Sequence, residues 1–312
     1  MKIGIPRALL YHKYHVMWQV FFKELGIPVL VSKQTSKDMF DCGLKYCLDE
    51  ICLPIKTFYG HVIDLKDKVD CIFIPQVISI EKRKRKFSFT CPKMIGLPDM
   101  IKATFPDLKV LKIRIDEQKR SSFLSYLLLG LKLKRNPFRS LRAYIKAKKA
   151  QINFEKKNKE KFKRSQESKL RIALLSHSYN LCETYPNINV ERALEKLGVV
   201  PLTLEMLPRE EMLKEAEEIF PELSWNYERE LLGAARHIMK RKLAHGVIMI
   251  ANFGCGPDSL VGDYILRLAR RQSNIPFAMI VTDEHTGEAG IMTRLEAFID
   301  MVSYKVNKST KL

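Results

Sequence analysis

The strongest constraint on the fold is an alternation of short apolar runs with segments of helical periodicity. The clearest run, Gly246–Asn252, is continuously apolar, as is typical of a central strand in a parallel sheet. Val69–Val77 reads as another buried strand, and Leu9 to Leu25 carries apolar residues at helical spacing. The alternation occurs twice along 312 residues. The sequence therefore predicts an α/β chain with two Rossmann-like or flavodoxin-like parallel-sheet domains.

A basic helical segment separates the two halves. Residues 131–170 contain 15 Lys and Arg and only 3 Asp and Glu, in a chain whose net charge is +19. We expect an N-terminal α/β domain at 1–116, a basic helical connector at 117–167 and a C-terminal α/β domain at 168–312. Basic segments also bind nucleic acid or anionic lipid, but no nucleic-acid-binding motif accompanies this one. We favour the interpretation that this segment is the solvated face of a helix. The second interpretation is that it docks an acidic protein partner.

The chain has no pattern of a secreted or membrane protein. Lys2, Arg7 and Lys13 interrupt any apolar run at the N-terminus. The longest apolar stretch, Phe123–Leu131, is far shorter than the roughly 20 residues of a membrane helix. We therefore expect a cytoplasmic protein without a membrane span. Its seven cysteines, an odd number, argue against a disulfide framework.

Three cysteines, Cys52, Cys91 and Cys255, lie where loops are expected to lead into helices. Each is followed closely by proline, which favours the first turn of a helix. Helix N-termini favour thiolates, and three thiolates from separate loops can hold a metal or an iron–sulfur cluster with one position open. Their spacing forms no local motif. Taken singly, each is better explained as a buried thiol or part of a tight turn, because free cysteines are among the most buried residue types.

The other four cysteines are interpreted as structural or peripheral. Cys71 lies within an apolar strand, and Cys182 follows a strand in a turn. Cys42 and Cys47 form a C-x4-C-x4-C run with Cys52. This run is a secondary candidate for a cluster, because a helix break is expected before Pro54.

Longer motifs resemble the uncharacterised domain of the CoA-enzyme activase family. They are Lys2–Leu9, Cys52–Lys56, Tyr59–His61, Val69–Pro75, Phe253–Ser259, Asp283–Gly290 and Thr293–Phe298. This family is similar to the cluster-bearing subunits of 2-hydroxyacyl-CoA dehydratases and benzoyl-CoA reductases. The resemblance implies a [4Fe–4S] cluster held by Cys52, Cys91 and Cys255.

The resemblance also implies single-electron chemistry on an acyl-CoA-type substrate. The fused relatives carry an ATPase module, but no glycine-rich phosphate loop or Walker A motif occurs here. We therefore expect a chain that is not itself an ATPase and that needs a separate ATP-dependent activase or ferredoxin-type electron donor. A non-catalytic cluster carrier or assembly factor is the alternative. The sequence is compatible both with a homodimer and with one subunit of a heteromer.

The histidines divide into one candidate catalytic residue and structural ones. His285 follows an expected buried strand, and neighbouring carboxylates such as Glu288 could orient it or raise its pKa. His285 and Glu288 are therefore the candidate catalytic residues. His61 and His177 are interpreted as hydrogen-bonded structural groups, the commoner role of a lone histidine.

Four further residues are expected to support the cluster. Lys56 and Lys93 each follow a cysteine closely, and a nearby cation lowers a thiolate pKa and offsets cluster charge. Gly254 and Gly256 flank Cys255 in the expected cofactor loop.

Overall fold

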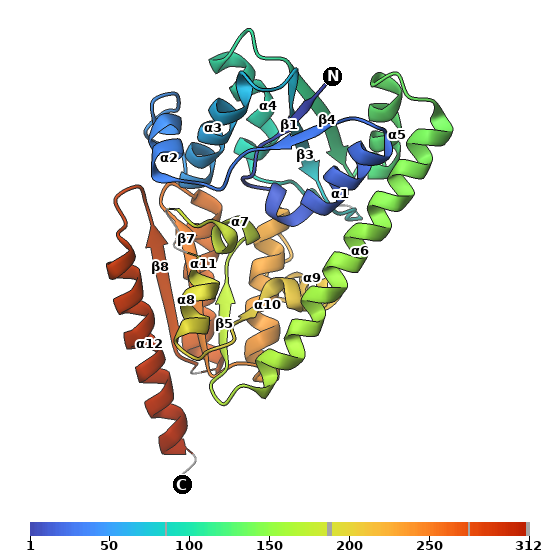
Figure 1. The fold of residues 1–312 in the computed structure, drawn as a ribbon. Helices are drawn as coiled ribbons and strands as arrows, with labels where there is room; N and C mark the ends of the chain where they lie inside the picture. Colours follow the sequence, from blue (N-terminus) through green and yellow to red (C-terminus); the bar gives the residue numbers. More distant parts are fainter. Residues whose placement is uncertain (85, 186–188, 274, 310–312) are drawn as a thin grey trace. The chain divides into compact units, whose positions relative to one another are not determined.

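The computed structural model describes residues 1–84, 86–185, 189–273 and 275–309. It divides into two compact units, Met1–Lys156 with Ser224–Asn226, and Lys157–Leu223 with Tyr227–Leu312. Each unit contains a four-stranded sheet with every pairing parallel (Figure 1). The predicted fold class, two α/β domains of the Rossmann or flavodoxin type, is confirmed.

The first unit has the strand order β2-β1-β3-β4. Its elements are β1 (Ile3–Ile5), α1 (Tyr11–Glu24), β2 (Val29–Val31), α2 (Lys37–Leu44), α3 (Leu53–Lys66), β3 (Cys71–Ser79), α4 (Pro92–Thr104), β4 (Val110–Asp116), α5 (Ser122–Lys132) and the first part of α6 (Pro137–Glu167).

Aromatic side chains fill the core of the first unit. Phe22 of α1 contacts Phe73 of β3 edge to face, with ring centroids 5.1 Å apart. Phe21, on the same helix, contacts Tyr126 of α5 at 5.0 Å. These rings are buried and join α1 and α5 to the sheet.

The expected connector 117–167 consists of α5 and α6. Buried residues occur in both helices: Tyr126 in α5, and Ala143 and Ala147 in α6. The two helices therefore contribute to the core of the first unit and are not only a connector. The second unit begins within α6, at Lys157. In the described residues, no helix is both long and apolar enough to cross a membrane.

The second unit repeats the strand order of the first, as β6-β5-β7-β8. Its elements after α6 are β5 (Ile172–Leu175), α7 (Ser178–Cys182), α8 (Val190–Lys196), β6 (Leu202–Thr203), the 3-10 turn η1 (Leu204–Met206), α9 (Arg209–Ile219), α10 (Asn226–Arg241), β7 (Gly246–Asn252), α11 (Gly256–Leu268), the π-helical turn η2 (Ala269–Ser273), β8 (Phe277–Thr282) and α12 (Glu288–Ser309).

The core of the second unit lies between its sheet and flanking helices. Ile248 and Ile250 of β7 are fully buried and pack with Leu295 and Val302 of α12. Every residue of β7 is buried, which agrees with the continuous apolar run in the sequence. The central position of β7 fixes where the loop that follows it emerges.

Two elements differ from the sequence-based expectation. The sequence predicts a strand over Val199–Glu205, but β6 covers only Leu202–Thr203 because the chain turns into η1 at once. The sequence also predicts a helix across Cys42 and Cys47 with Ser36 as its N-cap, but α2 ends at Leu44. The N-cap is confirmed, because the Ser36 side chain accepts a hydrogen bond from the Met39 N–H.

Candidate functional site

The second sheet has its topological switch point between β5 and β7. The chain leaves β5 for β6 on one side of the sheet and returns to β7 on the other. Open parallel sheets bind ligands beyond the carboxyl ends of the strands at this point. Ser176 and His177 follow β5 directly, and 253–255 follow β7. These two loops therefore define the candidate site of the second unit.

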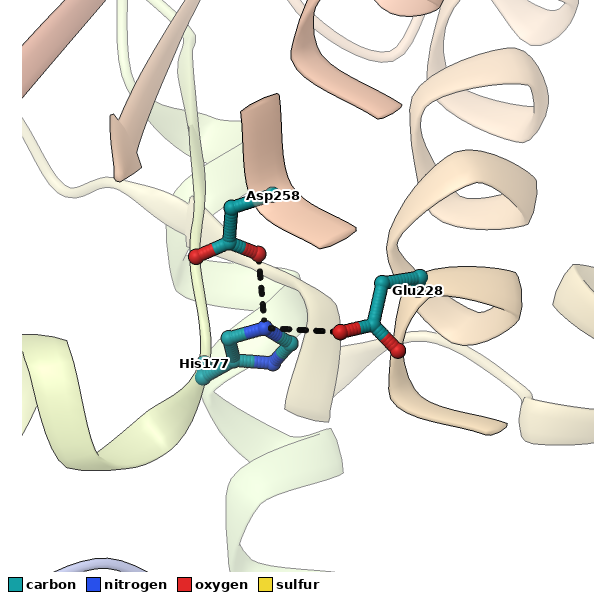
Figure 2. Close-up of side chains that lie close together, drawn as sticks. All are labelled: His177, Glu228 and Asp258. Carbon is teal, nitrogen blue, oxygen red and sulfur yellow. Dashed lines mark hydrogen bonds and ion pairs between the residues drawn. The ribbon is translucent and has the colours of Figure 1, made fainter. Parts of the chain in front are cut away.

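Three buried side chains from different elements meet there: His177, Glu228 and Asp258 (Figure 2). Nε2 of His177 lies 2.9 Å from Oδ1 of Asp258 and 3.9 Å from Oε1 of Glu228. His177 caps α7, while Glu228 and Asp258 stand in the first turns of α10 and α11. Their exposed fractions are only 6, 3 and 1%, so water scarcely reaches this acid–imidazole cluster.

Burial dominates the electrostatics of the acid–imidazole cluster. Loss of hydration raises the pKa of Glu228 to about 7; His177 lowers that pKa, whereas the Asp258 carboxylate adds to the rise. The second carboxyl oxygens, Oε2 of Glu228 and Oδ2 of Asp258, are buried without a hydrogen-bond partner in the part of the chain that the structure describes. Buried polar atoms are nearly always paired, so the cluster contains two unused acceptors.

Aromatic rings hold the imidazole in place. The Tyr179 ring stacks on His177, with centroids 5.1 Å apart, and the Tyr227 ring meets it edge-on at 6.1 Å. These contacts restrict the ring, so Nε2 is held facing both carboxyl groups.

A buried hydrogen-bond chain ties the strand ends beneath this cluster. The Ser176 hydroxyl donates to the Ile250 carbonyl, and the Asn180 amide donates to the Ser176 hydroxyl. The Asn252 amide donates to Asn180 at 2.6 Å, and the Thr282 hydroxyl donates to Asn252 at 3.1 Å. These hydrogen bonds connect the ends of β5, β7 and β8, so the loop that carries His177 has a rigid support.

The three candidate cluster cysteines all stand at helix N-caps. Cys52 precedes α3, Cys91 precedes α4 and Cys255 precedes α11, and each helix has proline in its first turn. These helices start where the sequence predicts. Cys52 is buried, whereas Cys91 and Cys255 are partly exposed.

Cys52 and Cys91 belong to the first unit and Cys255 to the second. Because the three thiols are divided between the two units, their convergence on one cluster stays a prediction. Cys71 lies where expected, in β3, paired with Ile3 of β1 and nearly buried. Burial, reinforced by the Asp70 carboxylate, raises the pKa of the Cys71 thiol, which disfavours its role as a thiolate ligand.

The loop between β8 and α12 carries the two candidate catalytic residues, His285 and Glu288. Both are exposed, and Glu288 is the first residue of α12. Asp283 shapes the loop: its Oδ1 accepts hydrogen bonds from the Thr286 hydroxyl at 2.6 Å and the His285 N–H at 2.9 Å. The Thr286 hydrogen bond lowers the pKa of Asp283 most, so this carboxylate remains charged and keeps the loop in shape.

The four expected supporting residues lie close to cysteines along the chain. Lys56 is buried in the first turn of α3, and Lys93 is partly exposed in the first turn of α4. Gly254 has a positive φ of 76°, which glycine adopts without strain. Among the described residues, and apart from its chain neighbours and its own helix backbone, nothing lies within 4 Å of a Cβ added at Gly256, so the space beside this residue is open.

Sequence reasoning missed the acid–imidazole cluster. It interpreted His177 as structural, included Asp258 only as part of a motif, and did not select Glu228. The usable signal was positional, since His177 and Asp258 follow the two strands that flank the switch point. No local pattern marks Glu228, whose inward direction depends on how α10 packs.

An apolar cavity lies in the first unit near the carboxyl ends of β1 and β3. Leu9, Trp18, Phe73 and Met94 are among the residues that line it, and its volume is about 10 Å³. This is about the volume that one water molecule requires. The cavity therefore has no room for an acyl chain.

Solved structures with some likeness to this chain have low similarity scores. FpvC of Pseudomonas aeruginosa, solved with Mn²⁺, is 10% identical over 98% of this chain and 97% of its own, with a TM-score of 0.29. The laminin binding protein of Streptococcus agalactiae, described as having adhesin and metal transporting activity, is 9% identical over 98% of each chain, with a TM-score of 0.27. Such low scores support no inference about this chain. No protein of curated function matches it.

A family model for the CoA enzyme activase uncharacterised domain matches residues 2–207. The match includes Cys52, Cys91 and His177, and it ends before Glu228 and Cys255. It covers the whole sheet of the first unit and reaches β6 of the second. The chain therefore belongs to the family of the CoA enzyme activase uncharacterised domain.

Proposed function

We propose that this chain is an iron–sulfur redox protein of an acyl-CoA dehydratase-type system, with Cys52, Cys91 and Cys255 as ligands of a [4Fe–4S] cluster. The observation that carries the proposal is the shared position of the three thiols. Each stands at the N-cap of a helix with proline in its first turn. Membership of the CoA enzyme activase domain family links the chain to acyl-CoA dehydratase systems.

The residues present fit such a cluster chemically. The first N–H groups of a helix lack intrahelical acceptors, and the N-terminal end of the helix dipole is positive. Both effects stabilise a thiolate at the N-cap, which is the form that binds iron. Three protein thiolates leave one iron of a four-iron cluster open to a small ligand.

Four further residues have roles in this proposal. Lys56 and Lys93 stand in the first turns of the helices that follow Cys52 and Cys91, where their charges offset the negative charge of a cluster. His285 and Glu288 lie on the loop after β8 and are the candidates for contact with substrate.

The bound cluster would supply single-electron chemistry for an acyl-CoA-type substrate. The electron would come from a separate ATP-dependent activase or ferredoxin-type protein, since the chain has no Walker A motif. Basic residues of α6 suit an acidic electron carrier, because complementary charge speeds docking. Such docking would weaken steeply with added salt.

A non-catalytic cluster carrier or assembly factor is the second candidate. A carrier needs no acyl pocket. Binding of an acyl-CoA to the cluster-loaded chain, measured by calorimetry, would support the enzyme, and absence of binding would support the carrier.

Iron and sulfide analysis with electron paramagnetic resonance tests the cluster directly. The full chain, purified without oxygen, is expected to contain about four irons and a signal after reduction. Cys52→Ser, Cys91→Ser and Cys255→Ser should each lose or alter that signal. Cys42→Ser, at an exposed position, is the control and should retain it. An iron-free chain after anaerobic reconstitution would contradict the proposal.

A further inference from the structure

The acid–imidazole cluster of the second unit presents three ligand atoms to one region of space. One ligand atom from each of His177, Glu228 and Asp258 lies within 4.8 Å of the other two. Nε2 of His177 is 2.9 Å from the Asp258 oxygen and 3.9 Å from the Glu228 oxygen. Ligands at about 2.0–2.2 Å from a tetrahedral ion lie about 3.4 Å apart. The observed separations bracket that value, so small side-chain movements would complete such a site.

The two carboxyl groups of the acid–imidazole cluster are not fully hydrogen-bonded by the described residues. Oε2 of Glu228 and Oδ2 of Asp258, the oxygens that do not face the imidazole, are buried without a partner among the described residues, and these side chains are only 3 and 1% exposed. One imidazole proton at Nε2 cannot serve both carboxyl groups that face it (Figure 2). A divalent ion would be neutralised by two carboxylates and would leave the imidazole neutral, so no net charge would be buried.

We propose that His177, Glu228 and Asp258 bind one divalent first-row transition-metal ion. An imidazole nitrogen with two carboxylates suits Zn²⁺, Mn²⁺, Fe²⁺ or Co²⁺, whereas Mg²⁺ and Ca²⁺ prefer oxygen ligands alone. Three protein ligands leave at least one coordination position for water or a substrate oxygen. The ion would lie at the switch point of the second sheet, where ligands of such sheets bind.

The metal site is independent of the proposed iron–sulfur cluster because it uses no thiol. Asp258 follows Cys255 by three residues on α11, so the first turn of one helix would contribute to both sites. The competing explanation is a structural histidine–carboxylate ion pair. That explanation requires no metal and predicts no metal affinity.

A cobalt titration separates these possibilities. The full chain would carry Cys52→Ser, Cys91→Ser and Cys255→Ser, be stripped with a chelator and be titrated with Co²⁺. We expect one Co²⁺ per chain, with visible ligand-field absorption, no thiolate charge-transfer band, and displacement by Zn²⁺. Because the three thiols proposed for the iron–sulfur cluster are absent, failure of this test leaves the iron–sulfur proposal standing, and failure of the iron–sulfur test leaves this one standing.

Two near-isosteric variants and one control identify the ligands. Glu228→Gln and Asp258→Asn should each weaken Co²⁺ binding by at least about tenfold. Mutating even a residue that only hydrogen-bonds to a metal ligand lowers metal affinity by about 10–100-fold. Glu215→Gln removes a buried carboxylate of α9 outside the cluster and should leave Co²⁺ binding unchanged.

Either of two results would overturn the proposal. One is a folded triple-serine chain that binds no Co²⁺. The other is Co²⁺ binding that Glu228→Gln and Asp258→Asn leave intact. If the triple-serine chain does not fold, X-ray absorption of the cobalt-loaded wild-type chain replaces it. Glu228→Gln must then alter the nitrogen and oxygen shell without changing any sulfur shell, and an unaltered shell refutes the site.

Discussion

His177 and Asp258 are joined by a 2.9 Å hydrogen bond across 81 residues of sequence. His177 follows β5 and Asp258 follows β7, and these strands are neighbours in the sheet. The contact is thus a consequence of sheet topology: two loops far apart in the chain emerge side by side from adjacent parallel strands. The same topology identifies the switch point as the best place in the second unit for a ligand.

The first prediction contrasts a buried with an exposed histidine. His61 is fully buried, with Nδ1 2.8 Å from the Ser32 hydroxyl and Nε2 3.0 Å from the Thr35 hydroxyl. His61→Ala leaves a cavity and removes both contacts, so it should lower the free energy of unfolding by about 2–4 kcal/mol. His285→Ala is the control and should change it by less than about 0.5 kcal/mol. Urea denaturation of both variants tests this, and equal losses would contradict it.

The strand and helix pattern was predictable because the local pattern of apolar residues indicates which segments are buried. β7 is buried along its whole length and its sequence is continuously apolar. The starts of α3, α4 and α11 were also predictable, since a proline in the first turn marks each one.

The side-chain cluster was not predictable by the same means. Glu228 resembles any surface glutamate of an amphipathic helix until the packing of α10 buries it. The short β6 was missed for a related reason. Leu202–Thr203 is extended, but the chain then turns into η1 with apolar residues that a strand would also contain. Tertiary contacts, rather than local preference, decide both cases.

The second prediction separates a core cysteine from a proposed ligand. Cys71 is nearly buried in β3, so Cys71→Ser places a hydroxyl in an apolar environment and should cost about 1–3 kcal/mol. Its iron content per folded chain should not change. Cys255→Ser, at a partly exposed N-cap, should leave the fold largely intact and lose or change the cluster, which lowers or alters the iron content. Iron analysis and thermal melting, both without oxygen, test this pair; the reverse pattern would refute the assignment of the cysteines.

The third prediction concerns the two glycines beside Cys255. Gly254 has a φ of 76°, where an alanine Cβ is strained, so Gly254→Ala should destabilise the chain by about 1–2 kcal/mol. Gly256 lies outside that region of φ, and an added Cβ there has no described atom within 4 Å beyond its chain neighbours and its own helix backbone. Gly256→Ala should therefore be tolerated. Thermal melting of the two variants provides the comparison, and equal destabilisation would show that the turn has another conformation.

The last prediction is a pH dependence at Glu215, between α9 and α10. Its carboxylate accepts hydrogen bonds from Arg236 Nε at 2.8 Å and Lys240 Nζ at 3.0 Å. Burial acts to raise the pKa of Glu215, but the hydrogen bonds and charges of Lys240 and Arg236 outweigh it, so the pKa falls below 4.5.

A carboxylate whose pKa is lowered by folding stabilises the folded state at pH values above its unfolded-state pKa. That stabilisation is lost as the pH falls through the folded-state pKa. At neutral pH, Glu215→Gln should therefore lower the free energy of unfolding by about 1 kcal/mol, a modest loss because solvent weakens the contact with half-exposed Lys240. Below pH 4.5 the difference from wild type should shrink toward zero. Asp263→Asn, which breaks an exposed pair with Arg267, should cost a few tenths of a kcal/mol at most. Urea denaturation across this pH range measures both, and a Glu215→Gln loss that persists in acid would mean that packing, not charge, makes Glu215 stabilising.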